Sequence, residues 1–129
     1  MAERKQYRRR SDRPLIAVRL LLETEGFNYR KWGGAQHCKQ GDWLVDNDGD
    51  VYTVDADSFA QTYEAVGLGT FVKTTPVWAE RSDVAGSIQT REGHTHYAAG
   101  DYLVSNDKEG ADSYAIDAVK FHALYELSQ

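Results

Sequence analysis

The sequence predicts an α+β protein, rich in β-structure, in which two pseudo-symmetric repeats of strand, hairpin and short helix share one core. The first observation is a repeated block, GDWLV at residues 41–45 and GDYLV at residues 100–104. A second block follows in the same order, YTVDA at residues 52–56 and YAIDA at residues 114–118. Because two aligned blocks in one order are poorly explained by chance, we interpret the chain as an internal duplication.

The chain of 129 residues is long enough for one ordinary domain. We divide it into an arm over residues 1–13, a first repeat over residues 14–68 and a second repeat over residues 69–129. A unit of this size buries too little surface to be stable alone, so we expect the two repeats to form one compact domain.

The arm differs from the rest of the chain in charge. It holds six basic residues and two acids, Glu3 and Asp12, so its net charge is +4. The whole chain carries −5, and residues 14–129 therefore carry −9. We expect a disordered arm that makes weak electrostatic contact with nucleic acid, or that docks on the acidic body of its own or another subunit. Its basic residues are Arg4, Lys5, Arg8, Arg9, Arg10 and Arg13.

Each repeat follows the same local pattern. Strand-like residues 42–45 and 101–104 lead into turn-forming residues, which include Asp48-Gly49 in the first copy. Return strands follow, and then an aspartate stands where a helix N-cap belongs. Those aspartates are Asp55 and Asp117.

An aromatic pair follows each expected cap, Phe59 with Tyr63 and Phe121 with Tyr125. Because the two members are four residues apart, we expect each pair to share one helical face that packs into the common core.

Two regions leave alternatives open. Residues 17–19 correspond either to residues 71–73 or to residues 76–79 of the second copy. Residues 20–32 and 80–92 fit either a second hairpin or a short helix.

The repeated blocks resemble the signature of the PGDYG-type domain, a small domain of bacteria and phages. The resemblance rests on QGDWLV at 40–45, on AGDYLV at 99–104 and on the Tyr-x-(Val/Ile)…Phe-x-x-x-Tyr-Glu pattern at 52–64 and 114–126. Gln40 and Ala99 stand where the family has proline. The resemblance implies a small recurrent module, often carried by phages, and implies no particular activity.

Basic and aromatic side chains give the candidate binding site. Within a body of net charge −9, cations that converge would mark a pocket for an anion, and Trp32 could stack on a flat ring. We expect a non-enzymatic binding or regulatory module that holds a protein partner or a small anionic ligand in the groove between the repeats. The candidate residues are Arg19, Arg30, Lys31, Trp32, Lys73, Arg91, His94 and His96.

Two alternative functions remain. One is an enzyme that acts on a nucleotide or RNA through His94, His96 and Asp101; the other is RNA binding through the arm. Asp42 and Asp101 have a simpler interpretation as side chains that bond backbone N–H groups in the turns. We expect no metal site, because His94 and His96 lack a clear third ligand, and we assign no cofactor and no catalytic residue.

The single cysteine, Cys38, excludes an internal disulfide, and no apolar run is long enough to cross a membrane. We therefore expect a cytoplasmic protein, in the host cytoplasm if a phage encodes it, that makes no membrane contact and can form oligomers.

Overall fold

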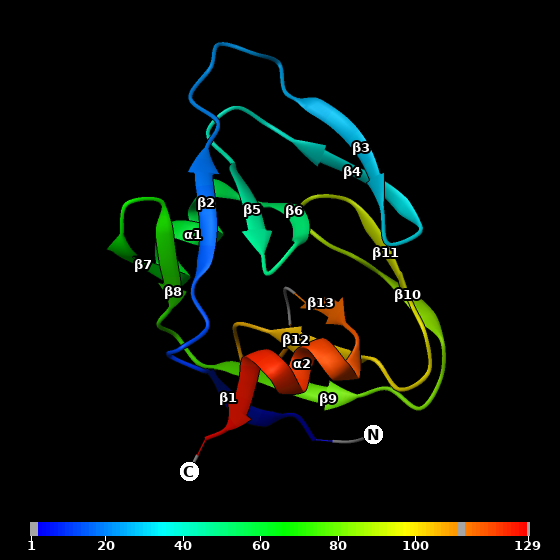
Figure 1. The fold of residues 1–129 in the computed structure, drawn as a ribbon. Coiled ribbons are helices and arrows are strands. Elements are labelled where there is room, and N and C mark those ends of the chain that lie inside the picture. Colours follow the sequence, from blue (N-terminus) through cyan, green and yellow to red (C-terminus); the bar gives the residue numbers. More distant parts are fainter. Residues whose placement is uncertain (1–2, 111–112, 129) are drawn as a thin grey trace.

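The computed structural model describes residues 3–110 and 113–128, which form strands and two short helices (Figure 1). The elements are β1 (Lys5–Arg9), β2 (Leu15–Arg19), β3 (Phe27–Lys31), β4 (Gly34–Cys38), β5 (Trp43–Asn47), β6 (Asp50–Val54), α1 (Ala56–Thr62), β7 (Tyr63–Gly67), β8 (Thr70–Lys73), β9 (Val77–Arg81), β10 (Gly86–Gln89), β11 (His94–Tyr97), β12 (Tyr102–Ser105), β13 (Ser113–Ile116), α2 (Ala118–Leu124) and β14 (Tyr125–Leu127). This content confirms a β-rich α+β protein. No helix in the described ranges is long and apolar enough to cross a membrane.

Two five-stranded sheets carry the fold. Their strand orders are β6-β5-β2-β8-β7 and β13-β12-β9-β1-β14, and every pairing in them is antiparallel. Figure 1 shows the first sheet with α1 above the second sheet with α2, and two hairpins at one side. Each sheet thus contains a hairpin, an earlier strand paired with it, the strand that follows its helix, and one strand between these last two.

The boundary expected at residues 68 and 69 does not divide the sheets. β8 follows that boundary, yet it pairs with β2 and β7 of the first sheet. β1 comes first in the chain, yet it lies between β9 and β14 of the second sheet. Strand pairing between distant segments is not determined by local sequence, so the division between the sheets does not follow the boundary between the repeats.

Residues 1–13 do not form a wholly disordered arm. Lys5–Arg9 form β1 in the interior of the second sheet, and Tyr7 packs edge-on against Phe121 with ring centroids 4.8 Å apart. The arm docks on acidic residues of its own chain: Arg4 pairs with Glu80 at 2.8 Å and Arg8 with Glu126 at 2.8 Å. Residues 1 and 2 of this segment lie outside the described residues.

Both helices begin at the expected aspartates. The Asp55 carboxylate accepts the N–H groups of Asp57 and Ser58, and that of Asp117 accepts the N–H of Lys120. Such capping satisfies donors that the first helical turn leaves free.

The helices end before the second member of each aromatic pair, which was expected on a helical face. Tyr63 and Tyr125 each stand at the first position of the next strand instead of on a helical face, because the backbone turns extended there. The ring of Phe59 still stacks on Tyr63 at 4.6 Å, and that of Phe121 on Tyr125 at 5.3 Å.

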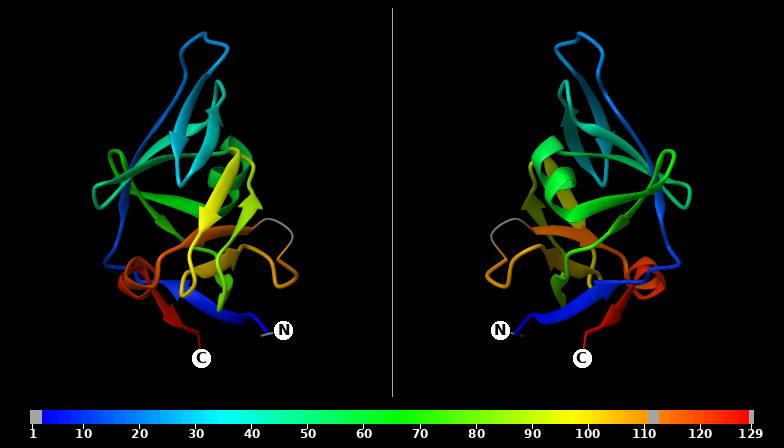
Figure 2. Two further views of the ribbon diagram at one scale, coloured as in Figure 1. Left: turned by 90° about the vertical axis from the view of Figure 1, so that its right-hand side faces the viewer. Right: turned by 90° about the vertical axis from the view of Figure 1, so that its left-hand side faces the viewer.

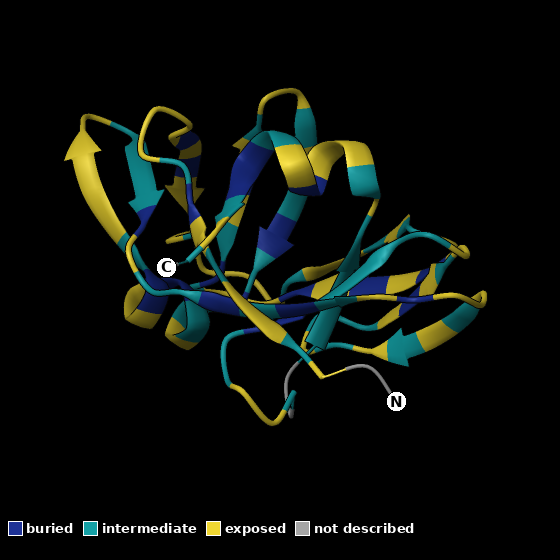
Figure 3. Cartoon of the chain, turned by 90° about the horizontal axis from the view of Figure 1, so that it is seen from below, coloured by how far each residue is buried: buried dark blue, intermediate teal, exposed yellow. Residues whose placement is uncertain are grey.

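Buried apolar side chains form two clusters instead of the single shared core that was expected. Figure 3 marks the buried, intermediate and exposed residues along the chain. Phe59 lies in the first cluster beside Leu15 and Val45, and Phe121 lies in the second beside Val77 and Val104. The space between the sheets contains charged and phenolic groups, so the apolar contacts are not continuous across it.

The two open regions both contain hairpins. β3 pairs with β4 and β10 with β11. Figure 2 shows β10–β11 running from the second sheet towards α1 of the first. An isolated bridge between Gln36 and Gly93 joins the two hairpins, so they link the halves at one side of the molecule.

Candidate ligand-binding cavity

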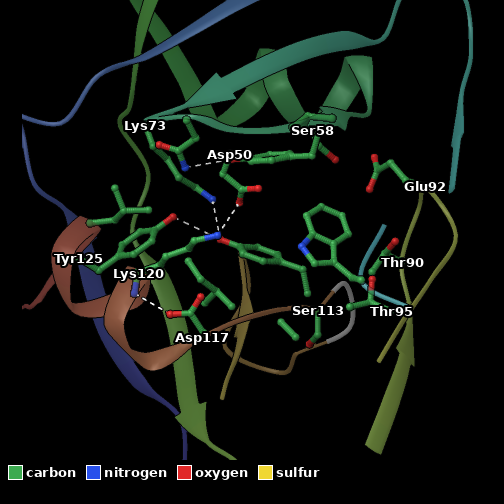
Figure 4. Close-up of a pocket in the computed structure, with 18 of the residues that line it drawn as sticks. Asp50, Ser58, Lys73, Thr90, Glu92, Thr95, Ser113, Asp117, Lys120 and Tyr125 are labelled. Atoms are coloured by element: carbon green, nitrogen blue, oxygen red, sulfur yellow. Dashed lines mark hydrogen bonds and ion pairs between the residues drawn. The ribbon is translucent and has the colours of Figure 1, made fainter. Parts of the chain in front are cut away.

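A cavity of about 360 Å³ lies between the two sheets (Figure 4). Its walls come from β6 and α1 in the first half, from β13 and α2 in the second, and from the tips of both hairpins. This volume is near the lower end of the range of pockets that hold small molecules. The cavity therefore has room for a metabolite-sized ligand.

Two buried cations line the cavity from matching places in the two sheets. Arg9 is the last residue of β1 and lies directly opposite Tyr125 in the strand register. Lys73 is the last residue of β8 and lies directly opposite Tyr63. Their exposed fractions are only 7% and 6%. Each cation also lies 5.7 Å from the ring centroid of its tyrosine, a cation–π contact.

Each cation reaches across to the other half. Lys73 Nζ lies 3.4 Å from the hydroxyl of Tyr114, and Arg9 Nη2 donates to Asn47 Oδ1 at 2.9 Å. Arg9 also donates through Nε and Nη2 to the carbonyl of Arg13. Arg9 also bonds the phenol of Tyr125, and among the described residues it forms no ion pair with a carboxylate.

Four tyrosines complete the cavity wall. Burial raises the pKa of Tyr52, Tyr63 and Tyr114, so these phenols stay protonated and can donate hydrogen bonds. The hydroxyl of Tyr114 lies 3.3 Å from that of Tyr125. Figure 4 shows Lys73 and Tyr125 reaching into the same space. The wall thus combines flat apolar rings with donors and positive charge.

Tyr125 differs from the other three. Burial raises the pKa of its phenol, but the positive charges of Lys73 and then Arg9, with hydrogen bonds from Tyr114 and Arg9, outweigh burial and lower the net pKa below its ordinary value. A negative charge at this place is therefore stabilised by the surrounding protein. The same field would favour an anionic group of a ligand.

We expect Lys73→Met to raise the pKa of Tyr125, because Lys73 is the largest of the influences that lower it. Since the folded-state pKa lies below the unfolded-state value, ionisation of Tyr125 adds stability only as the pH rises through the folded value. Phenolate absorbance, measured against pH and corrected with Tyr125→Phe, checks the pKa, and denaturant unfolding at a series of pH values checks the stability. A Tyr125 titration that is unchanged in Lys73→Met would contradict the first statement.

A charged network closes one side of the cavity. The carboxylate of Asp55 pairs with Lys39 at 2.6 Å and with Arg91 at 3.1 Å, and its backbone N–H donates to Glu92 at 2.8 Å. Burial raises the pKa of Glu92, and the nearby charges of Asp55 and Asp42 raise it further. The tip of β10–β11 is thereby attached to the start of α1.

The structure brings together half of the residues expected in the groove. Trp32, Lys73, Arg91 and His96 line the cavity. Arg19, Arg30, Lys31 and His94 are not among its lining residues. Arg19 instead donates to the carbonyl of Gly41, and Lys31 pairs with Asp50 at 2.8 Å.

Sequence reasoning missed Arg9, because that residue was assigned to the arm, and it missed the cavity role of the tyrosines. A weak signal for Arg9 was available: Arg9 stands five residues before Pro14, and Lys73 stands three residues before Pro76. Because the spacings differ by two residues, only a gapped extension of the repeat alignment would have paired the two cations.

The three residues expected to act together under the alternative enzyme hypothesis do not all line the cavity. His96 and Asp101 line the cavity, whereas His94 lies outside its lining. Asp101 accepts the N–H of Ala98 at 2.9 Å and Asp42 that of Lys39 at 3.0 Å, which confirms their structural role in the turns. In the described part of the chain, no group of three or more His, Cys, Asp or Glu side chains could hold a metal ion.

The fold and the cavity define a small β-rich protein with a cation-lined pocket between its two five-stranded sheets. Comparison of the chain with protein-family models, with curated proteins and with solved structures gave no match.

Proposed function

We propose that the protein is a non-enzymatic binding module that holds a small anionic ligand in the cavity between its two sheets. The observation that carries this proposal is the position of Arg9 and Lys73, two buried cations that face one cavity. Burial of a charge is costly unless an opposite charge or strong hydrogen bonds compensate it. Because Arg9 bonds a backbone carbonyl, an amide oxygen and the Tyr125 phenol, and no carboxylate among the described residues, an anion in the cavity would supply that compensation.

We also propose that the two halves are pseudo-symmetric repeats that exchange their first strands. Corresponding contacts support this: Trp43 stacks on Phe59 and Tyr102 on Phe121, both with centroids 4.2 Å apart. Under this proposal β1 and β8 correspond, and so do Arg9 and Lys73. The duplication would then have created the binding site, since each half supplies one cation and two tyrosines. Kinship with PGDYG-type domains, a bacterial or phage origin and a cytoplasmic location belong to the same proposal.

Three contacts favour a small ligand over RNA on the arm. Arg4 pairs with Glu80, and Arg8 and Arg10 both pair with Glu126, within 3.2 Å. Phosphate groups would have to displace these acidic partners. A protein partner is favoured less than a small ligand because the two cations are buried, beyond the reach of a flat protein surface.

The test is a thermal-shift and calorimetric screen with small anions: pyrophosphate, citrate, ribose 5-phosphate and the four ribonucleoside monophosphates. We expect at least one to raise the melting temperature, and Lys73→Met to bind it about ten- to a hundredfold more weakly. That range corresponds to loss of one hydrogen bond to a charged group, about 1.5–3 kcal/mol. Native mass spectrometry of protein purified from its host would show whether such a ligand is retained.

Lys5→Met is the matched control, because it removes the same charge from an exposed position of β1 outside the cavity. It should leave binding unchanged. Failure of every anion to bind, or an equal loss in both variants, would contradict the proposal.

A further inference from the structure

Trp32 occupies a backbone conformation that rarely suits tryptophan. It is the first residue of the two-residue turn between β3 and β4, with φ of 55° at Trp32 and 77° at Gly33. Turns of this kind favour Asn, Asp or Gly, because a side chain with positive φ meets its own backbone. The turn between β5 and β6 has similar angles and uses the favoured pair Asp48-Gly49. Strain of this kind, when the surrounding structure maintains it, points to a functional constraint.

The surrounding structure does hold this turn in place. Gln36, almost fully buried, donates through Nε2 to the carbonyl of Lys31 at 3.0 Å and to that of His94 at 2.7 Å. The carbonyl of Trp32 accepts the N–H of His96 at 2.8 Å. Lys31 is further tied to Asp50. The backbone of the turn is thus fixed beside β11, and the Trp32 side chain lines the cavity there.

The indole is partly exposed and lines the cavity. Its ring centroid lies 5.7 Å from that of Tyr52, and the planes are inclined by 51°. The two rings are therefore not stacked face to face. A flat aromatic ring that enters the cavity could stack on the indole, as nucleobases stack on tryptophan in many proteins.

The side chain of Asn106 has unused hydrogen-bonding capacity. Asn106 lines the cavity, and its Oδ1 is buried with no hydrogen-bond partner among the described residues. Asn47, in the corresponding turn of the first half, uses its Oδ1 to accept from Arg9. A buried amide oxygen without a donor is costly, and an N–H group of a ligand would satisfy it.

We propose that the ligand is a nucleoside phosphate: its base stacks on Trp32 and donates an N–H to Asn106, and its phosphate lies between Arg9 and Lys73. This inference rests on the proposed function and narrows it to one chemical class. The cavity wall thus offers an indole for the flat ring of the base, an amide oxygen for its N–H group and two cations for the phosphate. Trp32 is then the residue that selects ligands with a ring over other small anions.

The test compares ring-bearing and ring-free probes by calorimetry. We expect at least one of AMP, GMP, CMP and UMP to bind ten times or more tighter than ribose 5-phosphate. Trp32→Asn should weaken the binding of that nucleotide about ten- to a hundredfold, the range expected for one lost base–aromatic stack. The binding of ribose 5-phosphate should be unaffected. Because asparagine tolerates positive φ, the same variant should melt at an equal or higher temperature. Trp32→Phe, which keeps a smaller ring, should retain part of the affinity.

The outcomes separate the two proposals. If ribose 5-phosphate binds as tightly as all four nucleotides, or if Trp32→Asn weakens both kinds of probe equally, the nucleotide inference is overturned and the anion site stands. If no nucleotide, sugar phosphate, pyrophosphate or citrate binds the wild-type protein, both proposals are overturned. Weaker nucleotide binding together with a lower melting temperature in Trp32→Asn would assign Trp32 a structural role instead.

Discussion

Deletion of residues 1–13 is expected to abolish cooperative folding. The deletion removes β1 from between β9 and β14, so β14 loses its only partner in the sheet. It also removes Tyr7 from the second apolar cluster and the buried Arg9 from the cavity. Domains of this size have a free energy of unfolding of only about 5–15 kcal/mol, and the loss of an interior strand removes a large part of it. Circular dichroism and thermal melting would show the loss of the sigmoidal transition.

Deletion of residues 1–3 is the control, because β1 and the Arg4–Glu80 ion pair remain. It should leave the melting temperature within a few degrees of the wild type. A synthetic peptide of residues 1–13, added to the longer deletion, should restore the transition by adding a strand to the open sheet. A longer deletion that melts as the wild type does would show that β1 is dispensable.

Local signals explain the parts of the fold that the sequence predicted. The turn at Asp48-Gly49, the caps at Asp55 and Asp117, and the repeated GDWLV and GDYLV blocks each depend on neighbours in the chain. Turn, cap and strand preferences act over a few residues, so a single sequence shows them.

The pairing of β1 with the second sheet and of β8 with the first could not be predicted in the same way. Which strand lies beside β2 or β9 depends on contacts between residues far apart in the chain. β1 is also atypical for an interior strand, since four of its five residues are polar and only Tyr7 is aromatic. Its arginines are compatible with a strand because Arg8 pairs with Glu126 directly opposite and Arg9 bonds Asn47.

The candidate site was predicted in part for a related reason. Trp32 and Lys73 are conspicuous as an aromatic ring and a cation in an acidic body, and both line the cavity. Arg9 was hidden in a basic segment. Tyr63 and Tyr125 were assigned to helical faces because i and i+4 spacing fits a helix, yet the helices stop just before them. A helix end is the least determined feature of a short element.

Replacing Phe121 by alanine is expected to lower the free energy of unfolding by about 3–5 kcal/mol, the usual cost of removing a fully buried aromatic ring. Phe121 is 0% exposed and contacts the rings of Tyr7, Tyr102 and Tyr125. Phe59→Ala should cost a similar amount, because Phe59 contacts Trp43, Tyr63 and Phe71 in the same arrangement. Denaturant unfolding measures both values. A loss below about 1 kcal/mol at either site would contradict the packing described here.

The milder pair Phe59→Leu and Phe121→Leu decides whether the protein has two cores or one. The two rings lie in separate clusters that share no buried member, so their effects should add to within about 0.5 kcal/mol in the double variant. Leucine keeps most of the apolar volume, and the double variant therefore stays folded enough to measure. A coupling energy above about 1 kcal/mol would mean that the halves communicate through the tyrosines of the cavity and behave as a single core. Binding of a ligand in the cavity should then increase the coupling energy between the two substitutions, since the ligand would fill the space that separates the two clusters.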